Sequence, residues 1–261
     1  ELENLTYEST MRNCEKCTNH CMLTVTSFND GREYISGNRC ERGAGLPLKS
    51  KSLPNLFDYK YKRVFNYRSL ASEDASRGII WIPRVLNMYE NYPFWHTFFT
   101  ELKFRVVLSQ RSSKAVYEMG IESIPSESAC YPAKISHGHI ESLIRRGVKT
   151  IFYPSVVFER KEFEDQGNHF NCPVVQSYPE VIKNNVDTLE TEKIKFINPF
   201  VSLNNPKTMF SNLKEAFKEY SISDEELKNA IENAYKDSVD EREVKQYNYA
   251  LGILGKTASA Q

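Results

Sequence analysis

Between Gly78 and Asn205, short apolar runs alternate with longer stretches of helical pattern, and this alternation limits the fold more than any other feature. The pattern predicts strands at 79–82, 104–108, 150–153, 173–175 and 194–197, with helices at 91–102, 112–119, 128–146 and 179–184. Strands separated by helices of this length form βαβ units, whose strands are parallel and whose right-handed crossovers cover both faces of the sheet. The sequence therefore predicts an α/β fold built on a parallel sheet.

The N-terminal part of the chain holds four cysteines with the spacing Cys-x2-Cys-x3-Cys-x18-Cys. They are Cys14, Cys17, Cys21 and Cys40. The residues between the last two predict a hairpin, because strand formers from Met22 to Phe28 are followed by the turn signal Asn-Asp-Gly. The hairpin returns Cys40 to the side of Cys21. A unit this small needs a cross-link or a docking surface to be stable.

Four thiolates at this spacing predict a metal or cluster site. A Cys-x2-Cys turn directs two thiolates at one centre, about 2.3 Å from a zinc ion, and the same sulfurs could hold a [4Fe–4S] cluster. Soft thiolates suit both metals, so the residues leave zinc and iron open. We favour zinc because closed four-cysteine knuckles are a common structural zinc arrangement. Four thiols without a ligand are the remaining alternative, and His20 is either a substitute for one sulfur or an exposed neighbour.

Two further cysteines stand apart from this group. Cys130 lies at the start of the helix predicted at 128–146, where the helix dipole favours a thiolate. Its loop belongs at the carboxyl ends of the strands, where open α/β sheets form their sites. Cys172 precedes the strand predicted at 173–175 and meets Cys130 only if the fold brings the two together. Each of them is alternatively an ordinary packed thiol.

His137 and His139 lie in the same predicted helix. They are about 200° apart around its axis, so they cannot both face one metal. His137 is on roughly the same face as Cys130 and is a candidate proton-handling group, although we expect it to be capped or solvent-facing. No Gly-rich phosphate loop, Gly-x-Ser-x-Gly elbow or His-Glu-x-x-His occurs. An autonomous ATPase or hydrolase is therefore disfavoured, and other enzymatic roles stay open.

The composition excludes several classes of partner. Lys+Arg and Asp+Glu both number 34, so the overall charge indicates neither a nucleic acid nor an anionic membrane. The sequence contains no apolar run of roughly 18 residues and no signal peptide, so we expect a soluble, cytoplasmic protein. In that reducing compartment the cysteines are thiolate ligands or free thiols rather than disulfides.

These patterns divide the chain into four parts. We predict a four-cysteine knuckle and hairpin over residues 1–45, an irregular connector over 46–77, the α/β domain over 78–205 and a helical segment over 206–261. In the last part, Pro206 to Tyr220 is amphipathic, and Ser223-Asp224-Glu225-Glu226 is a capping-box signal for a second helix to about Leu251. The chain opens on Glu1 and not on a methionine, which suggests a segment of a longer polypeptide.

Several motifs are similar to those of one bacterial family. They are Ser36-Gly37-Asn38-Arg39-Cys40, Asn87-Met88-Tyr89-Glu90-Asn91-Tyr92-Pro93-Phe94-Trp95, Cys130-Tyr131-Pro132-Ala133-Lys134 with His137-Gly138-His139, and Asn171-Cys172-Pro173-Val174-Val175 with Tyr178-Pro179-Glu180. By these motifs the chain resembles the acyl-CoA dehydratase activase-related, or 2-hydroxyglutaryl-CoA dehydratase activator-related, proteins over nearly its whole length. The resemblance is to the region that follows their ATPase domains. It extends distantly to the iron–sulfur subunits of 2-hydroxyacyl-CoA dehydratases and benzoyl-CoA reductases.

The resemblance implies an iron–sulfur cluster held by cysteines on loops after strands, with Cys130 as the first ligand and Cys172 as a candidate second. The dehydratases place their second cysteine where this chain has Tyr153-Pro154-Ser155. They use three cysteines per cluster, so the third is expected beyond Gln261. Set against the family, the four-cysteine site resembles a structural clasp more than a functional centre.

The implied partners are activator-type ATPase domains, fused or separate, and an acyl-CoA-linked protein. The implied function is the acceptance or relay of low-potential electrons in the ATP-dependent activator and dehydratase system. A zinc-stabilised structural or docking module without redox activity is the alternative. Dehydration or reduction of an acyl-CoA at Cys130 itself ranks last, because a family resemblance does not transfer substrate specificity.

Overall fold

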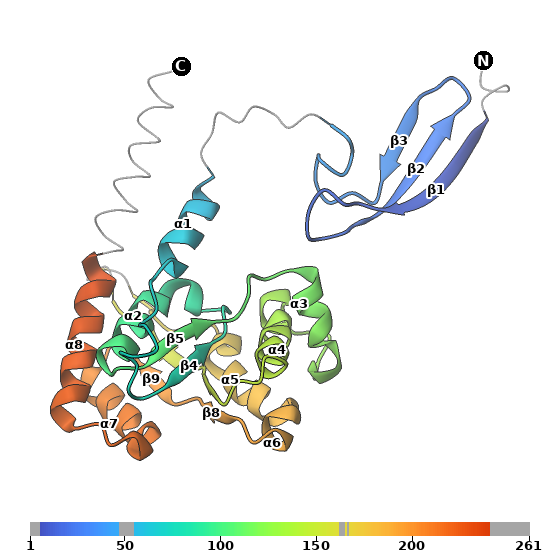
Figure 1. The fold of residues 1–261 in the computed structure, drawn as a ribbon. Helices are drawn as coiled ribbons and strands as arrows, with labels where there is room; N and C mark the ends of the chain where they lie inside the picture. The colour runs from blue at the N-terminus through green and yellow to red at the C-terminus, as the bar shows by residue number, and fades with distance from the viewer. Residues whose placement is uncertain (1–5, 47–54, 162–164, 166, 241–261) are drawn as a thin grey trace. The chain divides into compact units, whose positions relative to one another are not determined.

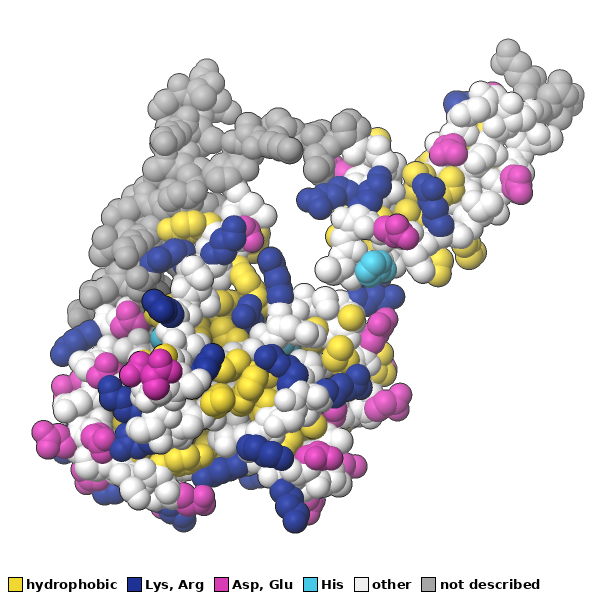
Figure 2. All heavy atoms as spheres, in the orientation of Figure 1, with side chains coloured by type: hydrophobic (Ala, Val, Ile, Leu, Met, Phe, Trp, Pro, Cys, Tyr) yellow, Lys and Arg dark blue, Asp and Glu magenta, His cyan; other side chains and the backbone are white. Residues whose placement is uncertain are grey.

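The computed structural model describes residues 6–46, 55–161, 165 and 167–240. The chain divides into two compact units, one of Glu1–Pro54 with Ser113–Ala115 and one of Asn55–Ser112 with Val116–Gln261. Each unit is built around sheet structure of its own. Lys and Arg side chains are interspersed with Asp and Glu over the visible face of the second unit, in keeping with the equal numbers of the two charges (Figure 2).

The first unit is an antiparallel sheet in the order β1-β2-β3 (Figure 1). Its strands are β1 (Tyr7–Asn13), β2 (Met22–Phe28) and β3 (Glu33–Ser36). The hairpin predicted from the turn signal is present, with Gly31 at a φ of +85°, where a side chain would be strained. Strand β1 was not predicted. All its residues are exposed, so it lacks the apolar alternation that marks a half-buried strand.

The second unit is built on a parallel sheet in the order β5-β4-β6-β8. Its strands are β4 (Ile79–Ile82), β5 (Arg105–Leu108), β6 (Thr150–Phe152) and β8 (Lys195–Ile197). Four of the predicted strands therefore form the sheet, and the α/β class with a parallel sheet is confirmed. A short parallel pair, β7 (Ser155–Phe158) with β9 (Phe200–Ser202), follows the ends of β6 and β8.

Helices flank the sheet on both sides (Figure 1). Helix α2 (Met88–Glu101) contacts α1 (Leu56–Phe65) and α8 (Asp224–Asp240), and α4 (Tyr131–Ile144) contacts α5 (Pro173–Asn185). The shorter helices are α3 (Lys114–Met119), α6 (Thr188–Thr191) and α7 (Pro206–Ala216), with 3-10 turns at Ile121–Ser123 and Lys218–Tyr220. Within the described ranges, no helix combines the length and the apolar character needed to cross a membrane.

Aromatic side chains of α2 form the centre of the core. Trp95 and Phe99 are fully buried, and both have ring centroids 4.8 Å from that of Phe152 on β6. Phe217, after α7, lies 5.6 Å from Phe99. Edge-to-face contacts of this kind contribute about 0.5–1.5 kcal/mol each beyond the burial of area. Phe217 is also 6.0 Å from Phe152, so these rings form one cluster that joins α2, the sheet and the segment after α7.

Three predicted elements differ from the structure. Residues 173–175 are the first turn of α5 and not a strand. Proline is favoured at the start of a helix, because the N–H groups there have no partner within the helix and proline lacks one. The helix expected from Asn91 already begins at Met88. The predicted connector over 46–77 contains α1, whose N-cap Asn55 accepts a hydrogen bond from the backbone of Asp58. The end predicted for the last helix, near Leu251, lies outside the described residues.

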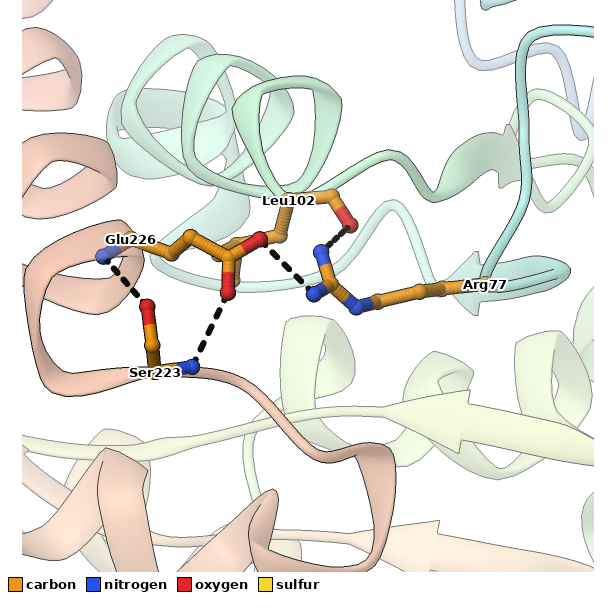
Figure 3. A network of polar contacts seen from close by, with 4 residues as sticks. All are labelled: Arg77, Leu102, Ser223 and Glu226. Carbon is orange, nitrogen blue, oxygen red and sulfur yellow. Dashed lines mark hydrogen bonds and ion pairs between the residues drawn. The ribbon is translucent and has the colours of Figure 1, made fainter.

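The start of α8 has the predicted capping box (Figure 3). Ser223 Oγ accepts from the Glu226 backbone N–H at 3.2 Å, and Glu226 Oε2 accepts from the Ser223 N–H at 2.9 Å. Arg77 extends the network, since its Nη2 donates to Glu226 Oε1 at 2.8 Å and its Nη1 to the Leu102 carbonyl at 3.0 Å. The network joins the loop before β4 to the end of α2 and the start of α8.

Candidate functional site

The carboxyl edge of the parallel sheet is the candidate site. In chain order the four strands are arranged 2-1-3-4, so the direction of the connections reverses between β4 and β6. Ligands of open α/β sheets bind at such a point, outside the carboxyl ends of the strands. Trp81 pairs with Ile151 across the two strands, so the loops that follow β4 and β6 start side by side.

Two side chains that follow β4 and β6, one in the loop before α2 and one at the start of β7, are buried with unpaired polar atoms. Asn87, 7% exposed, has neither amide atom hydrogen-bonded within the described residues, and the same holds for Oγ of Ser155, which is fully buried. Asn87 is the N-cap of α2, yet its side chain does not cap the helix. A buried polar atom without a partner costs about 1–3 kcal/mol. Buried polar groups without a protein partner mark places where a ligand or a water molecule can supply the missing hydrogen bond.

Cys130 and Cys172 occupy equivalent positions on two neighbouring helices. Each is an N-cap residue, Cys130 of α4 and Cys172 of α5, and both are exposed. Because α4 and α5 each lead toward the next parallel strand, their N-termini lie toward the carboxyl edge of the sheet. The expectation that Cys172 precedes a strand is therefore wrong. The structure places both thiols at helix starts on that edge.

His137 lies in the middle of α4, and its side chain contacts α5. Its Nδ1 is 2.9 Å from Ser123 Oγ and its Nε2 is 3.2 Å from Tyr178 OH. Burial lowers the pKa of His137 to about 4. Burial, followed by the charge of Cys130, raises the pKa of Tyr178 to about 12. His137 is fully buried, so the expectation of a capped or solvent-facing side chain is wrong.

His139 makes a separate set of contacts. Its Nδ1 is 2.7 Å from Ser109 Oγ and its Nε2 is 2.9 Å from Ser112 Oγ. Burial lowers the pKa of His139 to about 4, and the positive charge of Arg84 lowers it further. The imidazoles of His137 and His139 contact different side chains, in keeping with their spacing along the helix. Both are neutral at neutral pH and neither is exposed.

Glu159 joins two of the motifs that carry the family resemblance. The side-chain amide of Asn91 donates to both of its carboxylate oxygens at 3.0 Å. The amide of Asn171 donates to Oε1 at 2.6 Å and to the Val156 carbonyl at 3.0 Å. Asn171 directly precedes Cys172, so this clamp fixes the chain where it enters α5. Glu159 has no local sequence signal of its own, and the asparagine in each of the two motifs is the only hint of it.

The N-terminal cysteines lie on segments that meet at one end of the first unit. The Cys14 N–H donates to the Cys21 carbonyl at 2.8 Å, which extends the β1–β2 pairing. Lys16 Nζ donates to the Arg42 carbonyl at 2.8 Å. Gly37 lies so close to β2 that an added Cβ would be 2.4 Å from the Met22 carbonyl oxygen. These contacts bring the segment that holds Cys40 against the loop that holds the other three.

The thiols themselves are not gathered around one point. Cys14 is buried, Cys17 and Cys21 are half-buried, and Cys40 is exposed. Among residues 6–46 and the rest of the described chain, no three His, Cys, Asp or Glu side chains are arranged as a ligand set. The backbone thus brings the four cysteines to one end of the unit without converging their sulfur atoms. The metal site stays a prediction.

An open parallel sheet with this strand order, with helix N-termini and unpaired polar groups at its carboxyl edge, defines a doubly wound α/β domain. The family model of the CoA enzyme activase uncharacterised domain (DUF2229) matches residues 80–252. The match covers more than half of the 261 residues, so the chain belongs to this family. The predicted membership of the activator-related family is confirmed. The comparisons with curated proteins and with solved structures gave no match.

Proposed function

We propose that this domain works with an ATP-dependent activator of CoA enzymes of the 2-hydroxyacyl-CoA dehydratase type. In this proposal the carboxyl edge of its sheet accepts or relays low-potential electrons. Membership of the CoA enzyme activase family supports the association. The observation that carries the redox role is the placement of Cys130 and Cys172, which start two helices in contact with each other at that edge.

The surroundings of these two thiols suit an anionic ligand. Helices α4 and α5 are 14 and 13 residues long, and Cys130 and Cys172 are their N-cap residues, next to the positive end of each helix dipole. A positive helix end favours the thiolate form, which is the form that binds a metal. An iron–sulfur cluster bound there would supply one-electron redox chemistry. At this edge the described residues provide two thiols, which do not complete a cluster, so the proposal requires further ligands from a partner domain or subunit.

Anaerobic reconstitution with iron and sulfide, in the presence of an activator-type ATPase, tests this proposal. We expect charge-transfer absorption and a reducible paramagnetic centre. Both signals should be lost in Cys130→Ser and in Cys172→Ser and retained in Cys14→Ser, which is the matched control at a thiol of the first unit. A wild-type complex without either signal contradicts the proposal.

The second candidate is a zinc-stabilised docking module without redox activity, which binds the activator ATPase or an acyl-CoA-linked partner. The small core of the first unit favours it, since the buried apolar residues there, within residues 6–46, are Cys14, Leu23 and Val25. A short sheet with so little buried area requires additional stabilisation, and metal binding would provide it as folding free energy. The meeting of the cysteine-bearing segments at one end of the unit is consistent with such a clasp.

Elemental analysis with an optical spectrum of anaerobically purified protein separates the candidates. The zinc module predicts colourless protein with one zinc per chain. Cys14→Ser should then release the zinc and unfold the first unit while the α/β unit stays folded. Cys172→Ser is the control, because it should leave the zinc content unchanged. Metal content unchanged by Cys14→Ser excludes the four-cysteine site.

A further inference from the structure

Strand β1 has an open edge. It pairs with β2 along its whole length, and all of its residues from Tyr7 to Asn13 are exposed. Within the part of the chain that the structure describes, no strand pairs with its other side. An open edge presents N–H and C=O groups that can pair with another strand. Hydrophobic side chains are also exposed along the strands of this unit (Figure 2).

The pairing with β2 identifies the groups that face outward. The Cys14 N–H donates to the Cys21 carbonyl and the Asn29 N–H donates to the Thr6 carbonyl. Because hydrogen-bonded pairs alternate along an antiparallel ladder, the even-numbered residues of β1 bond to β2. The odd-numbered residues, Tyr7, Ser9, Met11 and Asn13, therefore direct their N–H and C=O groups to the open edge.

The side chains of β1 are self-complementary. In an antiparallel pair of two copies with a two-fold axis at Thr10, Glu8 of each copy lies opposite Arg12 of the other. These are non-hydrogen-bonded pairs, in which side chains approach most closely. A parallel arrangement in register would instead place Glu8 against Glu8 and Arg12 against Arg12. No ion pair to another described residue occupies either side chain within the first unit.

We infer that β1 is a dimerisation strand, which pairs with β1 of a second copy of this chain and joins two three-stranded sheets into one. Ser9 of one copy then exchanges both backbone hydrogen bonds with Met11 of the other. Tyr7 and Met11 lie on one face of β1, so Tyr7 of one copy contacts Met11 of the other diagonally across the pair. The charge pattern suits a second copy, because the antiparallel pair about Thr10 places each Glu8 opposite an Arg12.

The pairing surface is small. Specific interfaces bury about 1,200–2,000 Å² in total, and a single strand pair lies at or below that range. We therefore expect a reversible dimer whose population rises with protein concentration. The pairing also makes one continuous apolar face, since Tyr7 and Met11 lie on the same side of the sheet as Met22 and Tyr34.

Sedimentation of the full chain with two charge variants tests the inference. Glu8→Arg and Arg12→Glu each place like charges opposite one another twice, so each should raise the dimer Kd roughly tenfold or more. In an equimolar mixture the cationic strand of the first variant faces the anionic strand of the second, and dimers should form again. The double variant should also recover the wild-type Kd. Glu33→Arg, the same charge change on β3, is the matched control and should leave the Kd unchanged.

Each other outcome overturns the inference. A wild-type chain that stays monomeric at the highest concentration reached shows that β1 does not pair. If the dimer Kd is the same in the wild type and in the single charge variants, the dimer forms through another surface, such as the apolar face of the sheet. A mixture that dimerises no better than its components excludes the antiparallel register about Thr10. Circular dichroism of each variant establishes that its fold is retained.

Discussion

The imidazole Nε2 of His137 lies 3.2 Å from the phenol oxygen of Tyr178, and this contact joins helix α4 to helix α5. Cys130 is the N-cap residue of the first of these helices and Cys172 is that of the second. The two contacting residues lie at similar depths in their helices, about two turns beyond each cap. The buried pair therefore fixes how the two thiols are placed relative to one another at the edge of the sheet.

The two buried histidines should make the protein sensitive to acid. The pKa values of His137 and His139 are lowered to about 4 by burial, whereas an unfolded histidine titrates near 6.5. Between pH 6.5 and 4 the unfolded chain therefore binds protons that the folded chain does not. We expect the free energy of unfolding to fall as the pH falls through this window, by up to about 1.4 kcal/mol per pH unit for each histidine.

Urea denaturation from pH 8 to pH 4 measures this dependence. His139→Gln should be less stable at neutral pH but should have a shallower pH dependence. His20→Gln, at an exposed histidine, is the control and should follow the wild type. A wild-type stability that is flat across the window contradicts the assignment of two neutral buried imidazoles.

Gly138 should tolerate no side chain. A Cβ at this position would lie 1.7 Å from the carbonyl oxygen of Val116, because the backbone of α4 packs directly on that of α3. Gly138→Ala should therefore destabilise the α/β unit by about 3 kcal/mol or prevent its folding. Ser142→Ala on the same helix is the control, since it removes a buried hydroxyl without a described partner and should be neutral or stabilising. Equal midpoints of thermal unfolding for the two variants would refute the close approach.

The Glu159 clamp should depend on the carboxylate. Both carboxylate oxygens of Glu159 accept hydrogen bonds in the wild type. In Glu159→Gln an NH₂ group replaces one of these oxygens, so at least one hydrogen bond is lost. We expect a loss of about 1–3 kcal/mol in the free energy of unfolding. Glu190→Gln, at an exposed residue of the short helix α6, should change the free energy of unfolding little. If both variants unfold at the wild-type urea concentration, the clamp does not contribute to stability.

Glu226 should stabilise the protein only above acidic pH. Its hydrogen bond to Arg77, and then those to Ser223, lower the pKa of Glu226 to about 2, compared with about 4.3 for an unfolded glutamate. The stabilisation is therefore complete above about pH 5 and is lost as the pH falls toward 2. Glu226→Gln keeps a residue that suits a capping box and removes the ion pair. The difference in thermal midpoint between wild type and variant should shrink over this range, and a constant difference would exclude an ionic origin.

The sequence predicted the parts of the fold that local patterns encode. The strand Ile79–Ile82 was found because a short apolar run follows a glycine, and the start of α8 because Ser223 and Glu226 have capping-box spacing. Residues 173–175 were predicted as a strand that continues the alternation of strands and helices, whereas Pro173 starts helix α5. Strand β1 was missed because its stability comes from pairing with β2 and not from an apolar face of its own.

The candidate site was predictable only in part, because it depends on contacts between distant segments. Cys130 and Cys172 were identified as candidates from their residue type and their neighbours. The pairing of Asn91 with Glu159 crosses 68 residues and follows no local spacing rule. The unpaired amide of Asn87 depends on how the loop after β4 is buried, which no property of the residue itself reveals. His137 was expected to be capped or solvent-facing, because the helix pattern does not show that Ser123 and Tyr178 cover its imidazole.

The aromatic core around α2 offers a spectroscopic consequence. The chain has two tryptophans, Trp81 and Trp95, and both belong to the α/β unit. Trp95 is fully buried among aromatic rings, and the guanidinium of Arg146 lies 4.5 Å from the ring centroid of Trp81. Intrinsic tryptophan fluorescence therefore follows the unfolding of the α/β unit alone and does not detect events in the first unit directly. If the proposed four-cysteine site holds a metal, its removal by a chelator would be followed through the ultraviolet absorbance of the thiolates and not through tryptophan emission.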